Sequence, residues 1–411
     1  MTQIYSADWV LPVEGEPIRD GAVAVEGGRI AAVGARDELG EGERFDGAAI
    51  LPGFVNAHSH LEYAVYAGFG DGLAFPEWLA LHIDRKARIG WDETLAIARF
   101  GAAECLRSGI TTVGDASYSG AAAPACDELG LKAVVYLEVF GSDLRCELGT
   151  FDERRELIAD SLSDRVRLGI SPHAPYTCTV ELYAACAALG LPLITHFRES
   201  EREPEGAPLT AIAESIRGGV AAHCVHVDAD EIALLAEHDV AVAHCPRSNA
   251  LLGCGIAPLR ELREAGIRVG LGTDSPASTP SFDMFEELRA AVMAARAREL
   301  RPDALGARDA LELATLGAAR ALGIDAETGS LADGKHADLT VVSLAGSPFL
   351  PWEDPAGAVV LGGSPERILL TVVDGTERYR RGITEWHELT AAAQSARSRL
   401  LASEPAARPA P

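Results

Sequence analysis

The chain has 411 residues, of which 48% are hydrophobic, and a formal net charge of −25 at pH 7. A chain of this length buries a large core, and one large domain with a smaller one is the natural expectation. The acidic charge argues against a sequence-independent nucleic-acid binder, because such binding needs clustered Lys and Arg that release counterions from phosphates. We therefore expect a small-molecule substrate and no nucleic-acid partner.

Neither a targeting segment nor a membrane span is predicted. The first 17 residues have no basic start followed by an apolar stretch, and no segment is apolar over the roughly 18 residues that a membrane span needs. The eight cysteines include no Cys-x-x-Cys pair, so neither a disulfide framework nor a zinc ribbon is indicated. We expect a cytoplasmic protein with no membrane partner.

Both ends of the chain have the pattern of short strands and turns. The first 45 residues contain short apolar runs separated by Gly and acidic residues, and a similar pattern returns in 337–342 and 368–375. We predict that residues 1–48 and 336–385 together form one small β-sandwich domain.

Residues 49–335 alternate short β-rich runs with stretches long enough for helices. Eight strand–helix units predict an α/β fold, a (β/α)8 TIM barrel whose active site lies at the C-terminal ends of the strands. An open doubly wound sheet is the alternative, but no Gly-x-Gly-x-x-Gly turn follows the first strand. For residues 386–411 we expect a C-terminal helix and a disordered tail. The eight strands are predicted to end near Asn56, Asp115, Val139, Ile170, His196, His223, His244 and Asp274, and the clearest helices cover 92–108, 180–189, 230–238 and 258–265.

Two histidines stand two residues apart after the first barrel strand. His58 and His60 share one face of an extended chain, so both imidazoles can converge on one ion. The pair alone is a weak signal, but His196, His223 and Asp274 stand at other strand ends, where ionisable groups are costly as core residues. Imidazoles with one carboxylate suit Zn²⁺ or Fe²⁺, and such an ion lowers the pKa of a bound water to about 7.

Glu199 is the candidate for proton transfer. It lies three residues after His196, close enough to move protons between water and substrate, although an ordinary surface carboxylate beside Arg198 is the alternative. The unrelated zinc site of cytidine deaminases needs His-x-Glu together with Pro-Cys-x-x-Cys. The segment 60–62 satisfies the first element and no segment satisfies the second, so that interpretation fails.

Taken together, these motifs resemble the amidohydrolase superfamily, in its branch of deaminases and chlorohydrolases. The resemblance runs from end to end and is carried by the segments 21–34, 52–60, 196–199, 223–226, 243–249, 272–275 and 329–342. It implies that the metal ligands are His58, His60, His196 and Asp274. It further implies catalytic roles for Asp274, for His223 beside the attacking water, and for Glu199 as the proton relay.

The number of metal ions follows from the fourth strand. Binuclear relatives bridge two metals through a carboxylated lysine there, but the segment 165–176 has no lysine and carries His173 instead. The resemblance therefore implies one divalent ion, with Zn²⁺ the first expectation and Fe²⁺ the second. Many relatives are dimers, so a homodimer is expected.

The resemblance implies a hydrolase of non-peptide carbon–nitrogen bonds, a cyclic amidine deaminase that releases ammonia from an aromatic heterocycle. The His-x-His-Leu-Glu segment 58–62, the segment 75–79, and the segment 245–249 followed by 252–255 resemble those of deaminases of 6-aminodeoxyfutalosine, an adenine-bearing intermediate of menaquinone synthesis. S-adenosylhomocysteine, methylthioadenosine or adenosine is the alternative, followed by guanine or pterin bases. Hydrolytic dechlorination or cyclic-amide opening would use the same site. A catalytically inactive relative is disfavoured, because all four ligands and the relay are present.

The predicted substrate contacts are Glu62, Glu138, His173, Arg198 and His244. The two histidines end barrel strands, and the carboxylate of Glu138 is placed to enter the same cavity. A buried ion pair with Arg198 or Arg247 is the alternative for Glu138. We interpret Phe75 and Trp78 as core residues, and His82 receives no role.

Overall fold

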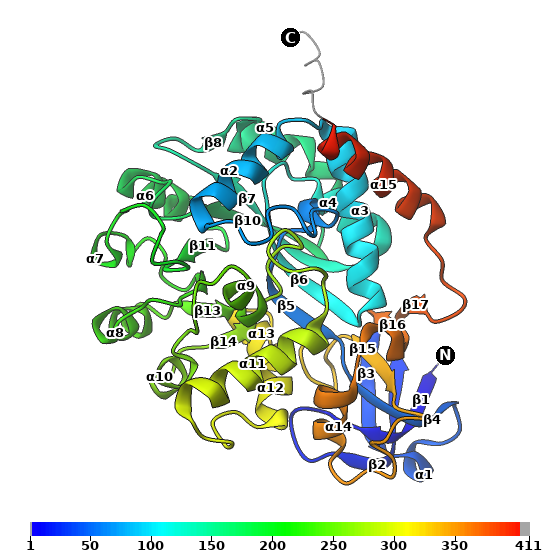
Figure 1. Ribbon diagram of the computed structural model, residues 1–411. Helices are drawn as coiled ribbons and strands as arrows, with labels where there is room; N and C mark the ends of the chain where they lie inside the picture. Colours follow the sequence, from blue (N-terminus) through cyan, green and yellow to red (C-terminus); the bar gives the residue numbers. More distant parts are fainter. Residues whose placement is uncertain (1, 403–411) are drawn as a thin grey trace.

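The computed structural model describes residues 2–402 (Figure 1). A barrel with helices around it makes up most of the molecule. A smaller sheet, built from strands of both ends of the chain, lies beside it. The expected disordered tail falls largely on 403–411, which lies outside the described residues. Within the described part, no helix is both long enough and apolar enough to cross a membrane.

Two four-stranded parallel sheets close into the barrel, in the orders β5-β6-β7-β10 and β11-β12-β13-β14. A bridge between Ile170 and Leu193 joins β10 to β11, and a bridge between Ser59 and Asp274 joins the end of β5 to the segment after β14. The eight predicted strands are therefore confirmed as one closed ring. Their bounds are β5 Phe54–Ser59, β6 Ile110–Ser117, β7 Lys132–Val139, β10 Val166–Pro172, β11 Ile194–Phe197, β12 Val220–His223, β13 Ala241–His244 and β14 Val269–Leu271.

Helices surround the strands, and the four predicted from the sequence correspond to α3, α6, α8 and α10 within one residue at either end. Their ends follow local chemistry. The side chain of Asp228 accepts from the backbone N–H of Glu231, whose carboxylate in turn accepts from the N–H of Asp228, which fixes the start of α8. The helices around the barrel are α2 Phe75–Lys86, α3 Trp91–Arg107, α4 Ala122–Leu129, α5 Phe151–Leu157, α6 Val180–Ala188, α7 Leu209–Ile212, α8 Ala229–Glu237, α9 Pro246–Leu251, α10 Leu259–Glu264, α11 Met284–Glu299, α12 Ala307–Leu313 and α13 Leu316–Ala321.

Strands from both ends of the chain form one seven-stranded sheet in the order β17-β16-β15-β4-β1-β2-β3. The pairing of β4 with β15, in which Pro52 lies opposite Leu339, connects the N-terminal strands to the C-terminal ones. All seven strands belong to a single hydrogen-bonded sheet, so a sandwich of two layers stays a prediction. The bounds are β1 Gln3–Val10, β2 Ile18–Glu26, β3 Arg29–Ala35, β4 Glu43–Pro52, β15 Leu339–Ser343, β16 Ile368–Val373 and β17 Thr376–Arg380, with α1 Arg36–Leu39 after β3 and α14 Pro355–Gly362 after β15.

The last helix, α15 His387–Leu401, returns to the barrel and packs on α3 (Figure 1). Its buried residues Ala393, Ala396 and Leu400 share an apolar cluster with Val65, Tyr66, Phe69 and Ile97. Arg397 donates hydrogen bonds to the backbone carbonyls of Val65 and Ala67. The helix therefore holds the segment that leaves the end of β5, which is the first strand of the barrel.

Candidate metal centre

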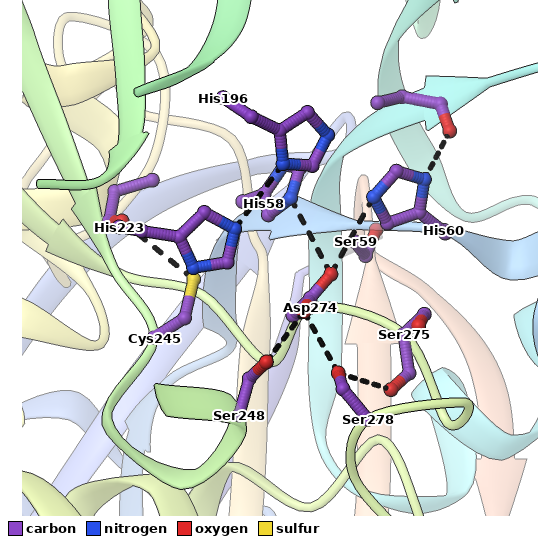
Figure 2. Close-up of polar contacts among 12 residues, drawn as sticks. His58, Ser59, His60, His196, His223, Cys245, Ser248, Asp274, Ser275 and Ser278 are labelled. Carbon is purple, nitrogen blue, oxygen red and sulfur yellow. Dashed lines mark hydrogen bonds and ion pairs between the residues drawn. The ribbon is translucent and has the colours of Figure 1, made fainter. Parts of the chain in front are cut away.

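Four side chains converge at the C-terminal ends of the barrel strands, as Figure 2 shows. His58 lies in β5, His60 directly follows it, His196 lies in β11, and Asp274 follows β14. The Oδ1 atom of Asp274 lies 3.5 Å from Nε2 of His58 and 3.4 Å from Nε2 of His60. Two atoms that are each about 2.1 Å from one tetrahedral ion are roughly 3.4 Å apart, so this spacing suits one shared ion.

Unpartnered nitrogen atoms show that the cluster fits a metal. Both ring nitrogens of His58 and the Nε2 of His196 are buried without a hydrogen-bond partner among the described residues. A buried polar atom without a partner is costly, and coordination to an ion would remove that cost. Burial lowers the pKa of His58 to about 4 and lowers the pKa of His196 as well. Both imidazoles are therefore neutral at pH 7, the state that metal coordination requires.

The ligands are oriented by hydrogen bonds behind them. The Nδ1 of His60 lies 2.7 Å from the carbonyl oxygen of Ala116, which can only accept, so the Nδ1 carries the proton and the Nε2 keeps its lone pair. The Oδ2 of Asp274 accepts from the hydroxyls of Ser248 at 2.6 Å and Ser278 at 2.7 Å (Figure 2). These two bonds leave Oδ1 facing the histidines.

A pair of hydrogen bonds between the first and last barrel strands places Asp274. The Nδ2 of Asn56 donates to the hydroxyl of Thr273 at 2.7 Å, and the backbone N–H of Thr273 donates to the Oδ1 of Asn56 at 2.9 Å. Asp274 itself has a φ of 56°, and His223 has a φ of 73°. Such left-handed backbone is unusual for these residues and collects at functional sites, where the surroundings hold it in place.

His223 and Glu199 lie beside the four ligands. The Nδ1 of His223 is 3.0 Å from the amide oxygen of Asn249, and its Nε2 is 3.2 Å from the Nδ1 of His196. When His223 is neutral, these two hydrogen bonds place a proton on the Nδ1 of His196. The Nε2 of His196 is then free for a metal. The Oε2 of Glu199 lies 3.7 Å from the Nε2 of His223. The two side chains are therefore neighbours beside the candidate ligands, close enough for one water molecule to bridge them.

Burial and neighbouring charges shift the pKa values of both Glu199 and His223. Burial raises the pKa of Glu199 to about 7. Burial alone would lower the pKa of His223, but the carboxylates of Glu199 and Asp274 outweigh it and raise that pKa above its ordinary value. A carboxyl group with a pKa of about 7 is suited to both taking and giving a proton at neutral pH, which fits Glu199.

A cavity of 190 Å³ opens directly onto this cluster. His60, His196, Glu199 and Asp274 line one part of it, and the aromatic rings of Phe75, Trp78, Phe140 and Tyr176 line another. A larger cavity, of 650 Å³, lies at the opposite end of the barrel, and its lining includes Lys132, the first residue of β7. That lysine is already paired with Asp338 and Asp374, and none of the cluster residues reaches this cavity. The cluster therefore opens onto the smaller cavity, at the end of the barrel where TIM-barrel enzymes have their active sites.

Two of the predicted substrate contacts line this cavity. The Oε1 of Glu138 is buried without a partner, and burial raises its pKa to about 7. It forms no ion pair with Arg198 or Arg247; the latter binds Glu287 at 2.7 Å. The Nδ1 of His173 is 2.8 Å from the hydroxyl of Thr177, and its ring stacks on Phe140 at 4.9 Å between centroids. Glu138 and His173 thus remain candidates for contact with substrate.

The other three predicted contacts do not line this cavity, although Glu62 lines an adjoining one. The carboxylate of Glu62 is taken up by the N–H groups of residues 119–121 and by the hydroxyls of Ser117 and Ser119, at the start of α4. Arg198 turns outward to Glu231 at 2.7 Å, with its side chain 47% exposed. His244 is buried but does not line the cavity. Contact of these three residues with substrate stays a prediction, because the direction in which each side chain points depends on the folded structure.

Sequence reasoning also missed residues that the structure brings to the site. Ser278 and Asn249 support Asp274 and His223, and their hydroxyl and amide groups gave no signal on their own. Phe75 is buried and Trp78 is half-buried, and both also line the cavity. His82, which received no role, lines it too, with a buried Nε2 that has no partner in the described structure.

Comparison with known proteins agrees with the geometry. The model of the amidohydrolase family matches residues 49–378. A 5'-deoxyadenosine deaminase of Methanothermobacter thermautotrophicus is 35% identical over 391 residues, 90% of this chain and 91% of that protein. A 5-methylthioadenosine/S-adenosylhomocysteine deaminase of Symbiobacterium thermophilum is 35% identical over 395 residues, 89% of this chain and 91% of that protein.

Solved structures show the same fold with zinc. An adenosine deaminase from Xanthomonas campestris with bound zinc has a TM-score of 0.89 and 28% identity, and the match covers 97% of this chain and 98% of the other. An atrazine chlorohydrolase from Arthrobacter aurescens, complexed with zinc, has a TM-score of 0.83 and 25% identity, covering 96% and 99%. With the metal cluster at the strand ends and the family match over most of its length, the chain belongs to the amidohydrolase family and is a hydrolase that acts on carbon–nitrogen bonds.

Proposed function

We propose that this protein is a metal-dependent deaminase of adenine nucleosides that releases ammonia from the purine ring. The observation that carries the proposal is the set of four buried ligands with Glu199 and His223 beside it, facing a cavity with aromatic walls. The names of the relatives support adenosine-type substrates such as 5'-deoxyadenosine and methylthioadenosine. They favour these over 6-aminodeoxyfutalosine, the first expectation from the sequence, which remains a narrower proposal within the same class.

One divalent ion, for which we propose Zn²⁺, would be held by His58, His60, His196 and Asp274. The β10 strand has no lysine, which supports a single ion. The zinc in two structural neighbours supports its identity. A bound ion supplies a hydroxide-like nucleophile at neutral pH, because it lowers the pKa of a water to about 7.

The protein's own residues then move the protons. His223 and Asp274 are placed to accept a proton from the attacking water, since both face the cluster and their hydrogen bonds hold them there. Glu199, with its pKa of about 7, is placed to donate a proton to the ring nitrogen next to the amino-bearing carbon. The aromatic walls would hold the planar base against these groups and exclude water. Water then replaces the amino group, which leaves as ammonia.

Hydrolytic dechlorination is the second candidate, because a chlorohydrolase shares the fold over nearly the whole chain. The two reactions differ in their leaving group, so they can be told apart directly. We would measure release of ammonia and of chloride by zinc-loaded protein, on a panel of 5'-deoxyadenosine, methylthioadenosine, S-adenosylhomocysteine, 6-aminodeoxyfutalosine, guanine and atrazine. Ammonia from the adenine nucleosides is the expected result. Chloride from atrazine with no ammonia from any amine would overturn the proposal.

A further inference from the structure

Two supports of the candidate metal centre come from the first turn of α9. The hydroxyl of Ser248 donates to the Oδ2 of Asp274 at 2.6 Å (Figure 2). The amide oxygen of Asn249, the next residue, lies 3.0 Å from the Nδ1 of His223. The helix has only six residues, and a helix this short has little stability of its own. The directions of Ser248 and Asn249 therefore depend on what holds α9 in place.

Arg247 holds the start of α9. Its backbone N–H donates to the Oε1 of Glu287 at 2.9 Å, and its Nε donates to the Oε2 of the same carboxylate at 2.7 Å. The side chain of Glu287 is fully buried, and Arg247 is 7% exposed. One carboxylate thus binds both the backbone and the side chain of Arg247, which fixes the first turn of α9 against α11 (Figure 1).

The same guanidinium also reaches the segment that carries Asp274. Its Nη2 donates to the carbonyl oxygen of Ser281 at 2.5 Å, and its Nη1 donates to the Oε2 of Glu286 at 2.5 Å. Ser281 lies between Asp274 and α11, three residues after Ser278, whose hydroxyl also donates to the Oδ2 of Asp274. Arg247 therefore joins the two segments that supply both hydroxyl donors to Asp274.

Net stability does not explain this buried ion pair. Its desolvation offsets its attraction, and hydrophobic residues of similar volume in place of such a pair often leave a protein equally stable. Burial raises the pKa of Glu287 to about 7 even with Arg247 beside it, in line with that cost. What the pair supplies, and an apolar pair would not, is direction, because a planar guanidinium donates along fixed lines.

We propose that the buried pair of Arg247 and Glu287 sets the geometry of the metal centre by orienting the side chains of α9 that support it. Through Ser248 the pair orients Asp274, the one carboxylate among the four proposed ligands. Arg247 and Glu287 are positioning residues, since neither lines the cavity of 190 Å³ and neither is bonded to a proposed ligand in the described structure. The inference rests on the proposed metal centre, and its test reads metal binding separately from turnover.

The test removes both charges at once. In Arg247→Met/Glu287→Leu no buried charge is left unpaired, so the free energy of unfolding of the metal-free protein should stay close to that of the wild type. We expect the affinity for Zn²⁺, measured by competition with a chelator, to fall by about 10–100-fold, as is typical when the support behind a ligand is lost. On 5'-deoxyadenosine, kcat should fall by about the same factor while KM changes by less than about threefold, because the cavity lining is unchanged. The visible absorption spectrum of the Co²⁺-loaded protein should also change, because its bands report the geometry of the ligands.

Arg247→Lys tests direction while keeping the charge. An ammonium can pair with Glu287 but cannot replace the fork that reaches three acceptors, so Zn²⁺ affinity and kcat should lie between those of the wild type and the double variant. The matched control is Arg260→Gln. Arg260 of α10 is 45% exposed and pairs at 2.6 Å with Glu299, at the other end of α11, so this variant should keep wild-type values.

Wild-type Zn²⁺ affinity and Co²⁺ spectrum in the folded double variant would overturn the positioning role, and so would equal losses in Arg260→Gln. If the double variant does not fold, Arg247→Lys decides, and wild-type Zn²⁺ affinity and kcat there would overturn the role. Absence of ammonia from 5'-deoxyadenosine with the wild-type protein would instead overturn the proposed function, and the Zn²⁺ affinities would still decide the role of the pair.

Discussion

Glu199 lines the cavity at the candidate metal centre, and its Oε2 lies 3.7 Å from the Nε2 of His223. Its place could be predicted from the three-residue spacing after His196, but the direction of Arg198 between them could not. Arg198 has a φ of 51°, and its side chain turns out to Glu231 while its neighbours in sequence face inward. The left-handed backbone at Arg198 accompanies this change of direction between Arg198 and Glu199, and a sequence pattern does not show it.

The proton relay predicts the behaviour of Glu199→Gln. The amide cannot give or take the proton, so kcat on 5'-deoxyadenosine should fall by about 10²–10⁴-fold. Glu199 is not among the four proposed ligands, so the variant should still bind one metal ion per chain. Metal analysis and steady-state kinetics on the same preparation check both statements. A variant with unchanged kcat would remove Glu199 from the mechanism.

Glu138 predicts a pH effect on stability. Burial raises its pKa from 4.5 to about 7 in the folded protein. Between these values the folded protein holds a proton that the unfolded chain has lost, so the free energy of unfolding decreases as the pH rises through this window. In Glu138→Gln that contribution is absent, and stability should decline less between pH 5 and pH 8. Urea unfolding at both pH values measures the difference, and parallel behaviour of the two proteins would show that Glu138 titrates normally.

At the scale of elements, the ends of the barrel strands could be predicted best. The helix that lines the cavity, α2, could be predicted least. The repeated strand–helix pattern predicts eight strands, and their ends bring the ligands together because parallel strands share one edge. By contrast, α2 belongs to the connection between the first two barrel strands. Its residues Trp78, His82 and Lys86 line the cavity. That placement depends on packing between distant segments, including α15, and no local periodicity encodes it.

The contact of α15 with the segment after β5 can be tested by Arg397→Ala. Arg397 binds the carbonyls of Val65 and Ala67 and lies over the ring of Phe69 at 4.5 Å. Its loss should lower the free energy of unfolding by about 1–2 kcal/mol, and it should raise KM because the segment lining the cavity is held less firmly. Arg399→Ala is the matched control, since the Arg399 side chain is 60% exposed in its ion pair with Glu93, and pairs at the surface contribute about 0–1 kcal/mol. Similar losses in both variants would contradict a specific role for Arg397.

At the scale of the whole molecule, one sheet joins the two ends of the chain and one barrel joins its first strand to its last. Paired hydrogen bonds between Asn56 and Thr273 close the barrel next to Asp274. The contact that closes the barrel therefore also brings candidate ligands together. His58 lies in the first barrel strand and Asp274 directly follows the last one. The sequence predicts the joined ends and the barrel; the depth and charge of the two cavities depend on the assembled molecule.

The measurement that tests the central claim most directly is ammonia release from 5'-deoxyadenosine before and after metal removal. We predict that chelated protein is inactive and that one Zn²⁺ per chain restores turnover. We also predict that Asp274→Ala, which loses a ligand, stays inactive after the same reloading. Full activity in the chelated protein, or in Asp274→Ala, would contradict a metal-dependent deaminase at this site.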